Sequence, residues 1–259
     1  MGGVVAVCAA AGTVTSTTCA LTLASSMPSG QPVLFAECDP SGGDLAAWAD
    51  LRETPGWSTA VAGGDRSWTG LRAHFQEMPS GLSVLCSPTQ ARTARPVVRE
   101  SAARFGSLLG SMSDVVIVAD CGRVGSEVPA WLAPASLVLL LVRQAPTSTG
   151  ATVARVDRAA EVMDRLAGSS ERRVGLVVVG SRPYEPQQLV DAVGGELFGV
   201  LPEDPIGAGL VAGAWTVGRG ASRSPLARAA RELAATVVET LTVSRTVVPF
   251  GGSRSEHAG

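Results

Sequence analysis

A run of small and hydroxylated residues near the N-terminus has the clearest capacity for chemistry. Residues 11–18 read A-G-T-V-T-S-T-T and stand between an apolar run at 4–8 and a segment expected to be helical from Cys19 to about Ser26. A phosphate-binding loop has the form G-x-x-x-x-G-K-[ST] between a strand and a helix. Its backbone N–H groups and lysine bind phosphate, and its hydroxyl holds Mg²⁺. The segment keeps the glycine and the hydroxyls of such a loop but lacks the lysine.

Two further motifs extend this pattern. Residues 37–45 read E-C-D-P-S-G-G-D-L after a second apolar run, and residues 114–122 read D-V-V-I-V-A-D-C-G. With the loop, they resemble the ParA/MinD family of deviant Walker-A ATPases, which read K-G-G-V-G-K-T-T and then D-x-D-P-x-G. The resemblance covers roughly residues 3–242, and it includes the L-P-E-D segment at 201–204 and a last helix opening at 224–226. It implies a SIMIBI-class P-loop domain.

The resemblance also assigns roles to single residues. Ala11 replaces the signature lysine, which in the family reaches the nucleotide of the other subunit, and Ser16 replaces the Walker lysine. Glu37, Asp39 and Asp120 stand where the family has acids that orient water and Mg²⁺. The candidate nucleotide-binding residues are Gly12, Thr13, Val14, Thr15, Ser16, Thr17, Thr18 and Asp120. Asp39 is the candidate catalytic residue, and Thr17 with Asp39 would hold Mg²⁺ if a nucleotide binds.

The missing positive charge bears directly on activity. All 21 basic residues are arginines, so no lysine elsewhere in the chain can replace those absent from positions 11 and 16. Phosphoryl transfer depends almost entirely on positioning and on stabilising negative charge. We therefore expect a ParA/MinD-like pseudo-ATPase with hydrolysis near background and no required cofactor, although ATP with Mg²⁺ could still bind.

Two alternatives stay open at this stage. Arginines could supply the missing charge, with Arg123, Arg219 and Arg223 as candidates, and the chain would then be an atypical nucleotide-binding switch with weak ATPase activity. An enzyme of the related amidotransferase or metal-insertion branch is the second alternative. The sequence offers no nucleophile with a partnered base for that chemistry.

The elements that must position these residues alternate between apolar strands and amphipathic helices. Further strands are expected at 82–86, 137–142, 174–179 and 196–201, and helices at 97–112, 147–166, 187–193 and 225–241. Such alternation predicts one three-layer α/β domain, with a mostly parallel central sheet covered by helices on both faces. The expected domain spans residues 1–243, and residues 244–259 are expected to form a disordered tail.

The composition restricts the kinds of partner that we expect this chain to bind and the compartment in which we expect it. The net charge of −2 argues against strong binding to nucleic acid or membranes. The five cysteines lack C-x-x-C spacing and read as reduced thiols of a cytoplasmic protein. Trp48, Trp57 and Trp68 lie in a glycine-rich stretch, where they either anchor a protein partner or pack this stretch onto the sheet. A homodimer is also compatible with the resemblance. We expect an adaptor or a localisation and regulatory factor for cell division, partition or pilus and secretion positioning.

Overall fold

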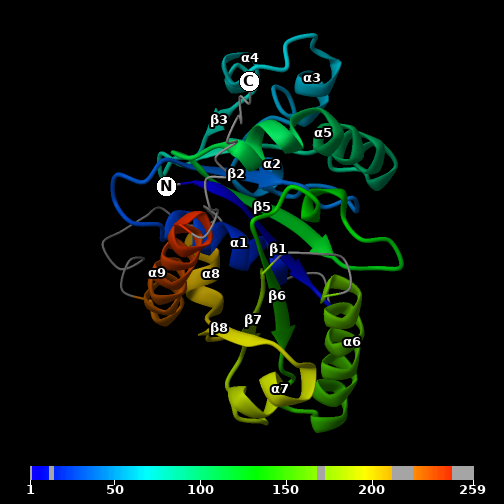
Figure 1. Cartoon of the computed structure of the whole chain (residues 1–259), viewed down its shortest axis with the longest axis vertical. Coiled ribbons are helices and arrows are strands. Elements are labelled where there is room, and N and C mark those ends of the chain that lie inside the picture. The colour runs from blue at the N-terminus through cyan, green and yellow to red at the C-terminus, as the bar shows by residue number, and fades with distance from the viewer. Residues whose placement is uncertain (1, 12–14, 168–172, 212–223, 247–259) are drawn as a thin grey trace, which may run out of the picture.

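An eight-stranded sheet forms the centre of the molecule in the computed structural model, which describes residues 2–11, 15–167, 173–211 and 224–246 (Figure 1). The strands are β1 (Gly3–Ala9), β2 (Val33–Glu37), β3 (Gln76–Glu77), β4 (Ser83–Leu85), β5 (Val116–Arg123), β6 (Leu137–Arg143), β7 (Arg173–Val179) and β8 (Glu196–Leu201). Their order is β3-β4-β2-β5-β1-β6-β7-β8. All neighbouring strands are parallel except the pair β3 and β4. The predicted fold class is confirmed.

Helices cover both faces of this sheet. They are α1 (Thr15–Ser25), α2 (Leu45–Trp48), α3 (Trp57–Ala62), α4 (Trp68–Arg72), α5 (Ala91–Ser111), the 3₁₀ turn η1 (Ala130–Leu132), α6 (Thr149–Ala167), α7 (Pro186–Val193), α8 (Pro205–Val211) and α9 (Pro225–Thr246). One face packs against α1, α2, α8 and α9. The other packs against α3, α4, α5, α6 and α7. Figure 1 shows α9 beside α1 on one side and α6 on the other.

The central strands are buried on both faces, and this fixes their register. In β1, Val4 and Ala6 point into the core under α5 and α6, whereas Val5 and Val7 point into the core under α1 and α9. Alternation of side chains along a strand produces this division. Each of these valines contributes about 1.5–3 kcal/mol on burial. A slip of one residue would exchange the two cores, so the loops at the carboxyl ends of the strands are held in fixed positions.

Several elements differ from the sequence-based expectations. Helix α1 begins at Thr15 rather than at Cys19, and α5 begins at Ala91 rather than at Val97. Ala94 is fully buried, so the apolar face of α5 extends upstream of Pro96 and the helix continues through the proline. The proline lacks an N–H, so this costs one backbone hydrogen bond. The short helix α8 was not predicted, because its glycines weaken the helical pattern.

The C-terminal helix α9 extends beyond its predicted end at residue 241 and reaches Thr246. It therefore includes the first residues of the expected tail, and residues 247–259 lie outside the described part of the chain. None of the helices in the described ranges combines the length and hydrophobicity needed to cross a bilayer.

An aromatic cluster joins the stretch before β3 to the rest of the domain. Trp57 is fully buried, with its ring centroid 5.2 Å from that of Trp131 and 6.0 Å from that of Phe105. The indole N–H of Trp131 donates to the Ser101 hydroxyl at 3.0 Å. The prediction that Trp57 anchors a partner is therefore wrong. Its ring is enclosed between Phe105 and Trp131, so no surface of it is left for a partner to contact. The same prediction for the half-buried Trp48 and Trp68 stays a prediction.

Replacing Trp57 by alanine is expected to lower the free energy of unfolding by about 3–5 kcal/mol, because it leaves a cavity between α3 and α5. Chemical denaturation followed by circular dichroism measures the change. Trp68→Ala is the matched control, and we expect a clearly smaller loss because this ring is only partly buried. Equal losses in the two variants would contradict the assignment of Trp57 to the core.

Candidate functional site

The carboxyl ends of β1, β2 and β5 bring the predicted site residues to one edge of the sheet. Asp120 in β5 is the register partner of Val7 in β1 and of Glu37 in β2. The backbone N–H of Cys38 donates to the Asp120 carbonyl at 2.7 Å and continues this pairing beyond β2. Helix α1 starts directly after the loop that follows β1. The candidates Gly12, Thr13 and Val14 lie outside the described residues, and Thr15 is the first residue of α1.

Thr17 and Asp120 are bonded directly to each other. The Thr17 hydroxyl donates to Asp120 Oδ2 at 2.5 Å, and the Gly122 N–H donates to Asp120 Oδ1 at 3.2 Å. Burial raises the pKa of Asp120 to about 6; the nearby Asp39 adds to this, while the Thr17 and Gly122 hydrogen bonds oppose it. The hydroxyl and the carboxylate that would flank Mg²⁺ thus satisfy one another.

Ser16, at the position of the Walker lysine, is 1% exposed. Its hydroxyl is also a hydrogen-bond partner of Asp120 and lowers the pKa of that carboxyl. The side chain is short and neutral, so it brings no positive charge toward the loop. In this structure the side chain at position 16 therefore supports the buried acid.

Asp39 lies against the backbone at the end of β5. Its Oδ1 accepts a hydrogen bond from the Ser41 N–H at 2.7 Å. Gly122 has a φ of +64°, and a Cβ at this position would lie 2.0 Å from Asp39 Oδ2. Only glycine allows this approach. The structure thus brings Thr17, Asp39 and Asp120 to the same edge of the sheet.

Glu37 does not face the loop, which corrects the expectation drawn from the family's acidic motif. Its Oε1 accepts from the Leu45 N–H at 2.7 Å, and its Oε2 accepts from the Ser87 N–H at 2.9 Å. A Cβ on Gly43 would lie 2.4 Å from Glu37 Oε2. Burial raises the pKa of Glu37 to about 7, and the two backbone hydrogen bonds oppose this rise. Glu37 therefore holds the chain at 43–45 and the end of β4.

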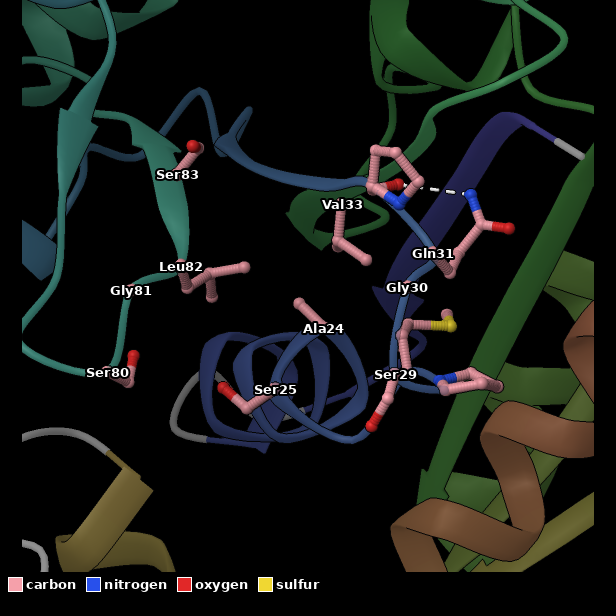
Figure 2. A pocket seen from close by; sticks show the side chains of 13 residues that line it. Ala24, Ser25, Ser29, Gly30, Gln31, Val33, Ser80, Gly81, Leu82 and Ser83 are labelled. Atoms are coloured by element: carbon pink, nitrogen blue, oxygen red, sulfur yellow. Dashed lines mark hydrogen bonds between the residues drawn. The ribbon is translucent and has the colours of Figure 1, made fainter.

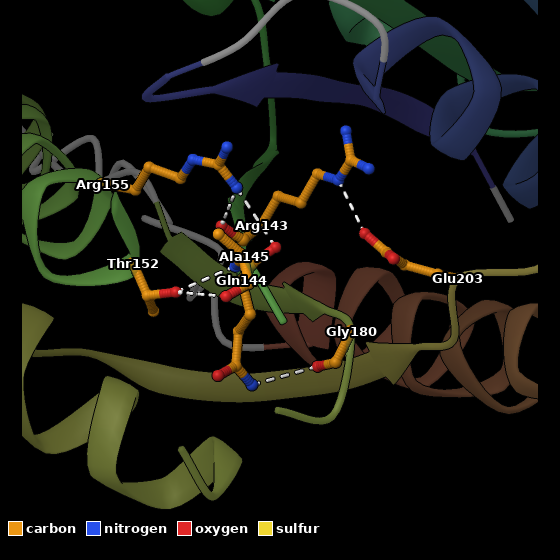
Figure 3. A network of polar contacts seen from close by, with 7 residues as sticks. All are labelled: Arg143, Gln144, Ala145, Thr152, Arg155, Gly180 and Glu203. Atoms are coloured by element: carbon orange, nitrogen blue, oxygen red, sulfur yellow. Dashed lines mark hydrogen bonds and ion pairs between the residues drawn. The ribbon is translucent and has the colours of Figure 1, made fainter. Parts of the chain in front are cut away.

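A small cavity of about 230 Å³ lies beside the start of α1. Thr18 and Cys19 form one wall, and the segment 201–205 with Arg143 forms the other. Arg143 Nε donates to Glu203 Oε1 at 2.8 Å (Figure 3). Sequence reasoning missed this arginine. The feature that could have identified it is its position directly after the apolar run 137–142, because that position lies at the edge where the parallel strands end.

Gln144, next to Arg143, is fully buried and ties the loop after β6 to the loop after β7. Its side-chain amide donates to the Gly180 carbonyl at 3.1 Å and to the Tyr184 carbonyl at 2.9 Å, and its Oε1 accepts from the Tyr184 N–H at 2.9 Å. Arg155 of α6 donates to the carbonyls of residues 143 and 144 (Figure 3). The cavity wall at Arg143 therefore has a rigid base.

Solved structures show what this architecture is similar to. The septum site-determining protein MinD with Mg-ADP from Pyrococcus horikoshii superposes with a TM-score of 0.70 at 15% identity, covering 94% of this chain and 99% of that chain. This observation decides the fold. The chain has the ParA/MinD-type P-loop fold.

Two more structures agree. A ParA family ATPase from Chlorobium tepidum gives a TM-score of 0.68 at 15% identity, covering 90% of this chain and 98% of that chain. The MinC:MinD cell division protein complex from Aquifex aeolicus gives a TM-score of 0.66 at 15% identity, covering 92% of this chain and 96% of that chain. No protein-family model matches the sequence. No curated protein matches it either.

Of the arginines that the sequence suggested, Arg123 does not line the cavity beside α1. Arg123 lines a separate cavity next to Ala11. Arg219 and Arg223 lie outside the described residues. Among the described residues, Arg143 is therefore the arginine that lines the same cavity as Thr18.

A further cavity, of about 460 Å³, lies at the opposite edge of the sheet. Figure 2 shows it between the end of α1, the turn before β2 and the turn before β4, with the serines 25, 29, 80 and 83 around it. It adjoins the amino ends of the strands, away from Asp39 and Asp120. No ionisable side chain lines it, so its side chains offer hydrogen bonds from the serines and Gln31 but no charge.

The cysteines form no metal site. All five are buried free thiols. Within the described ranges, no group of three or more potential ligands could hold a metal ion. Burial raises the pKa of Cys8 and Cys19 to about 12, so these thiols stay protonated and act as small apolar side chains.

Protonation of Glu37 should make stability depend on pH. The carboxyl has a pKa of about 7 when folded, against 4.5 as its reference value, so the folded state retains a proton that the unfolded state releases. The resulting stabilisation is complete below about pH 4.5 and is lost as the pH rises through 7, with a magnitude on the order of 3 kcal/mol. Denaturation midpoints measured from pH 4.5 to 8 should fall less steeply in Glu37→Gln than in the wild type.

The exposed Glu77 provides the control for this experiment. Glu77→Gln removes one acid without touching the buried site, and its profile should parallel that of the wild type. If Glu37→Gln also parallels the wild type, Glu37 does not exchange its proton in this range.

Proposed function

We propose that this chain is a ParA/MinD-like pseudo-ATPase that acts as an adaptor or regulatory factor in spatial positioning. The observation that carries the proposal is the closed polar group at the start of α1. Thr17 and Ser16 both hydrogen-bond Asp120, and no described cation lies among them. A helix start arranged in this way satisfies the buried carboxylate of Asp120 without Mg²⁺ or phosphate.

Energetics support loss of hydrolysis. Removing one donor that stabilises developing negative charge typically slows an enzyme about 10²–10³-fold. This chain has alanine at position 11 and serine at position 16, where the family has its two lysines. The nearby acids Asp39 and Asp120 repel a triphosphate. Helix α1 offers its N-terminal dipole to an anion, worth about 1 kcal/mol. That attraction is small beside the two lost charges.

The wider role rests on the fold and on what related structures contain. The MinD structure from Aquifex aeolicus is a complex with MinC, and we propose a protein partner for this chain as well. Division, partition or pilus and secretion positioning are the proposed processes, in the cytoplasm. A homodimer would have to form without the bridge of the signature lysine.

Purified protein with Mg-ATP is expected to show no steady phosphate release above buffer. The lysine-restoring variant Ala11→Lys/Thr15→Gly/Ser16→Lys should gain measurable hydrolysis, because it returns the two cations and the glycine to the loop. Asp39→Ala is the control in both backgrounds. Steady hydrolysis by the wild type that Asp39→Ala abolishes would overturn the pseudo-ATPase proposal.

A second function is favoured by Arg143. Its guanidinium lies at the cavity shared with Thr18 and Cys19, and its charge opposes the rise in the pKa of Cys19 that burial and Asp120 cause. Such an arginine can neutralise a phosphate, which would make the chain a nucleotide-binding switch with weak ATPase activity, holding Mg²⁺ through Thr17 and Asp39. Glu203 competes for the same guanidinium in this structure.

Calorimetry with millimolar ATP and Mg²⁺ separates the two functions. If the switch operates, saturable heat is expected, and Arg143→Gln should weaken binding about tenfold. Arg173→Gln is the control, because Arg173 also pairs with one glutamate but lies at the other end of its strand. Absence of both heat and thermal shift would remove the switch.

A further inference from the structure

A second cavity at the carboxyl edge of the sheet carries a concentration of arginines. It measures about 710 Å³ and lies between the loop after β1, the end of β5 and helix α6. Arg123 comes from the end of β5, and Arg158 and Arg165 come from α6. Residues seven apart on a helix are two turns apart on one face, so α6 presents both guanidinium groups to the same side.

The charges around this cavity are unbalanced. Glu161 is the one acid that lines it, against three arginines, so the wall carries a formal charge of about +2 at neutral pH. In the described part of the chain, neither Arg123 nor Arg158 forms an ion pair or a hydrogen bond through its side chain. Uncompensated positive charge on a concave wall raises the local concentration of anions.

The frame of the cavity is fixed. Arg165 Nη1 donates to the Gly125 carbonyl at 2.8 Å, which ties the segment after β5 to α6. Val124 and Val162 on either side are buried. Arg123 and Arg158 therefore extend from a braced surface, and a ligand need not order the backbone in order to bind.

Ala11 and Ala10 complete the opposite wall. Ala11 stands at the position where the family pattern has its lysine, and it contributes only a methyl group. The wall is thus apolar on one side and cationic on the other. A cavity of this size exceeds the volume of a single phosphate and falls in the range of small-molecule sites, about 300–1,000 Å³.

We propose that this arginine cavity binds a small organic phosphate, with the phosphate groups on Arg123 and Arg158 and the organic part against Ala10 and Ala11. A diphosphate group balances the net charge of the wall, and planar guanidinium groups match phosphate oxygens in pairs. The site is separate from the cavity beside α1, which Thr18 and Arg143 line. It does not depend on the proposed function, because it needs neither hydrolysis nor Mg²⁺.

The test uses tripolyphosphate without Mg²⁺ as the probe of the cationic wall. Isothermal titration calorimetry at low salt is expected to show one saturable site on the full chain. Arg123→Gln/Arg158→Gln should weaken binding at least about tenfold, because two charge-assisted contacts are lost. Glu161→Gln should tighten it about threefold by removing the one repelling charge, a gain that impaired folding cannot produce.

Arg95→Gln/Arg228→Gln is the matched control, since both residues are exposed arginines on α5 and α9 and neither lines the cavity. It makes the same change in net charge and should leave affinity within about twofold. Equal weakening in the two double variants, or no response to Glu161→Gln, would overturn the proposal. Replacing the probe by ADP without Mg²⁺ tests the organic part, which should tighten binding relative to pyrophosphate. Failure of the pseudo-ATPase proposal is seen separately, as Mg-ATP turnover.

Discussion

Two carboxylates buried on neighbouring strands set the conditions for the rest of this edge of the molecule. Glu37 and Asp120 are register partners in β2 and β5, and both are almost completely buried. A buried acid without a cation must either stay protonated or be surrounded by hydrogen-bond donors. Glu37 receives the N–H groups of Leu45 and Ser87, and Asp120 receives Thr17 and the Gly122 N–H. The need to satisfy these acids therefore determines where three loops and the start of α1 lie.

This arrangement explains how the fold is stable with alanine at position 11 and serine at position 16. A charge removed from a buried site normally leaves its partners unsatisfied, at a cost of several kcal/mol. Here Ser16 and Thr17 take over as partners of Asp120, so the site is complete without a ligand. The described arginines of this edge lie outside that group. Arg143 is held by Glu203, and Arg123 lies in the cavity against α6. Among the described residues, the positive charge of this edge therefore lies on its two sides and not at its centre.

Sequence patterns could predict the sheet and part of the site, because both follow from local rules. Apolar runs end at Asp39 and Asp120, and parallel strands place their carboxyl ends together, so the meeting of these acids with Thr17 was predictable. The partners of Glu37 were not, because Ser87 is fifty residues away and its position depends on how β4 packs. The burial of Trp57 depends in the same way on Phe105 and Trp131, from two distant elements. A glycine-rich stretch gives no periodicity from which such contacts could be read.

The division of the carboxyl edge has a consequence for what it can recognise. On the α1 side, acids satisfied by hydrogen bonds present little net attraction to an anion, whereas on the α6 side Arg123, Arg158 and Arg165 leave a net positive wall. Exposed charges act over about one Debye length, roughly 8 Å in physiological salt. An anion arriving at this edge is therefore drawn to the α6 side by nearby arginines rather than by the overall charge of −2. An anion can thus be attracted to this edge although residues 11–18 contain no cation, because the positive charge comes from Arg123, Arg158 and Arg165 on the α6 side.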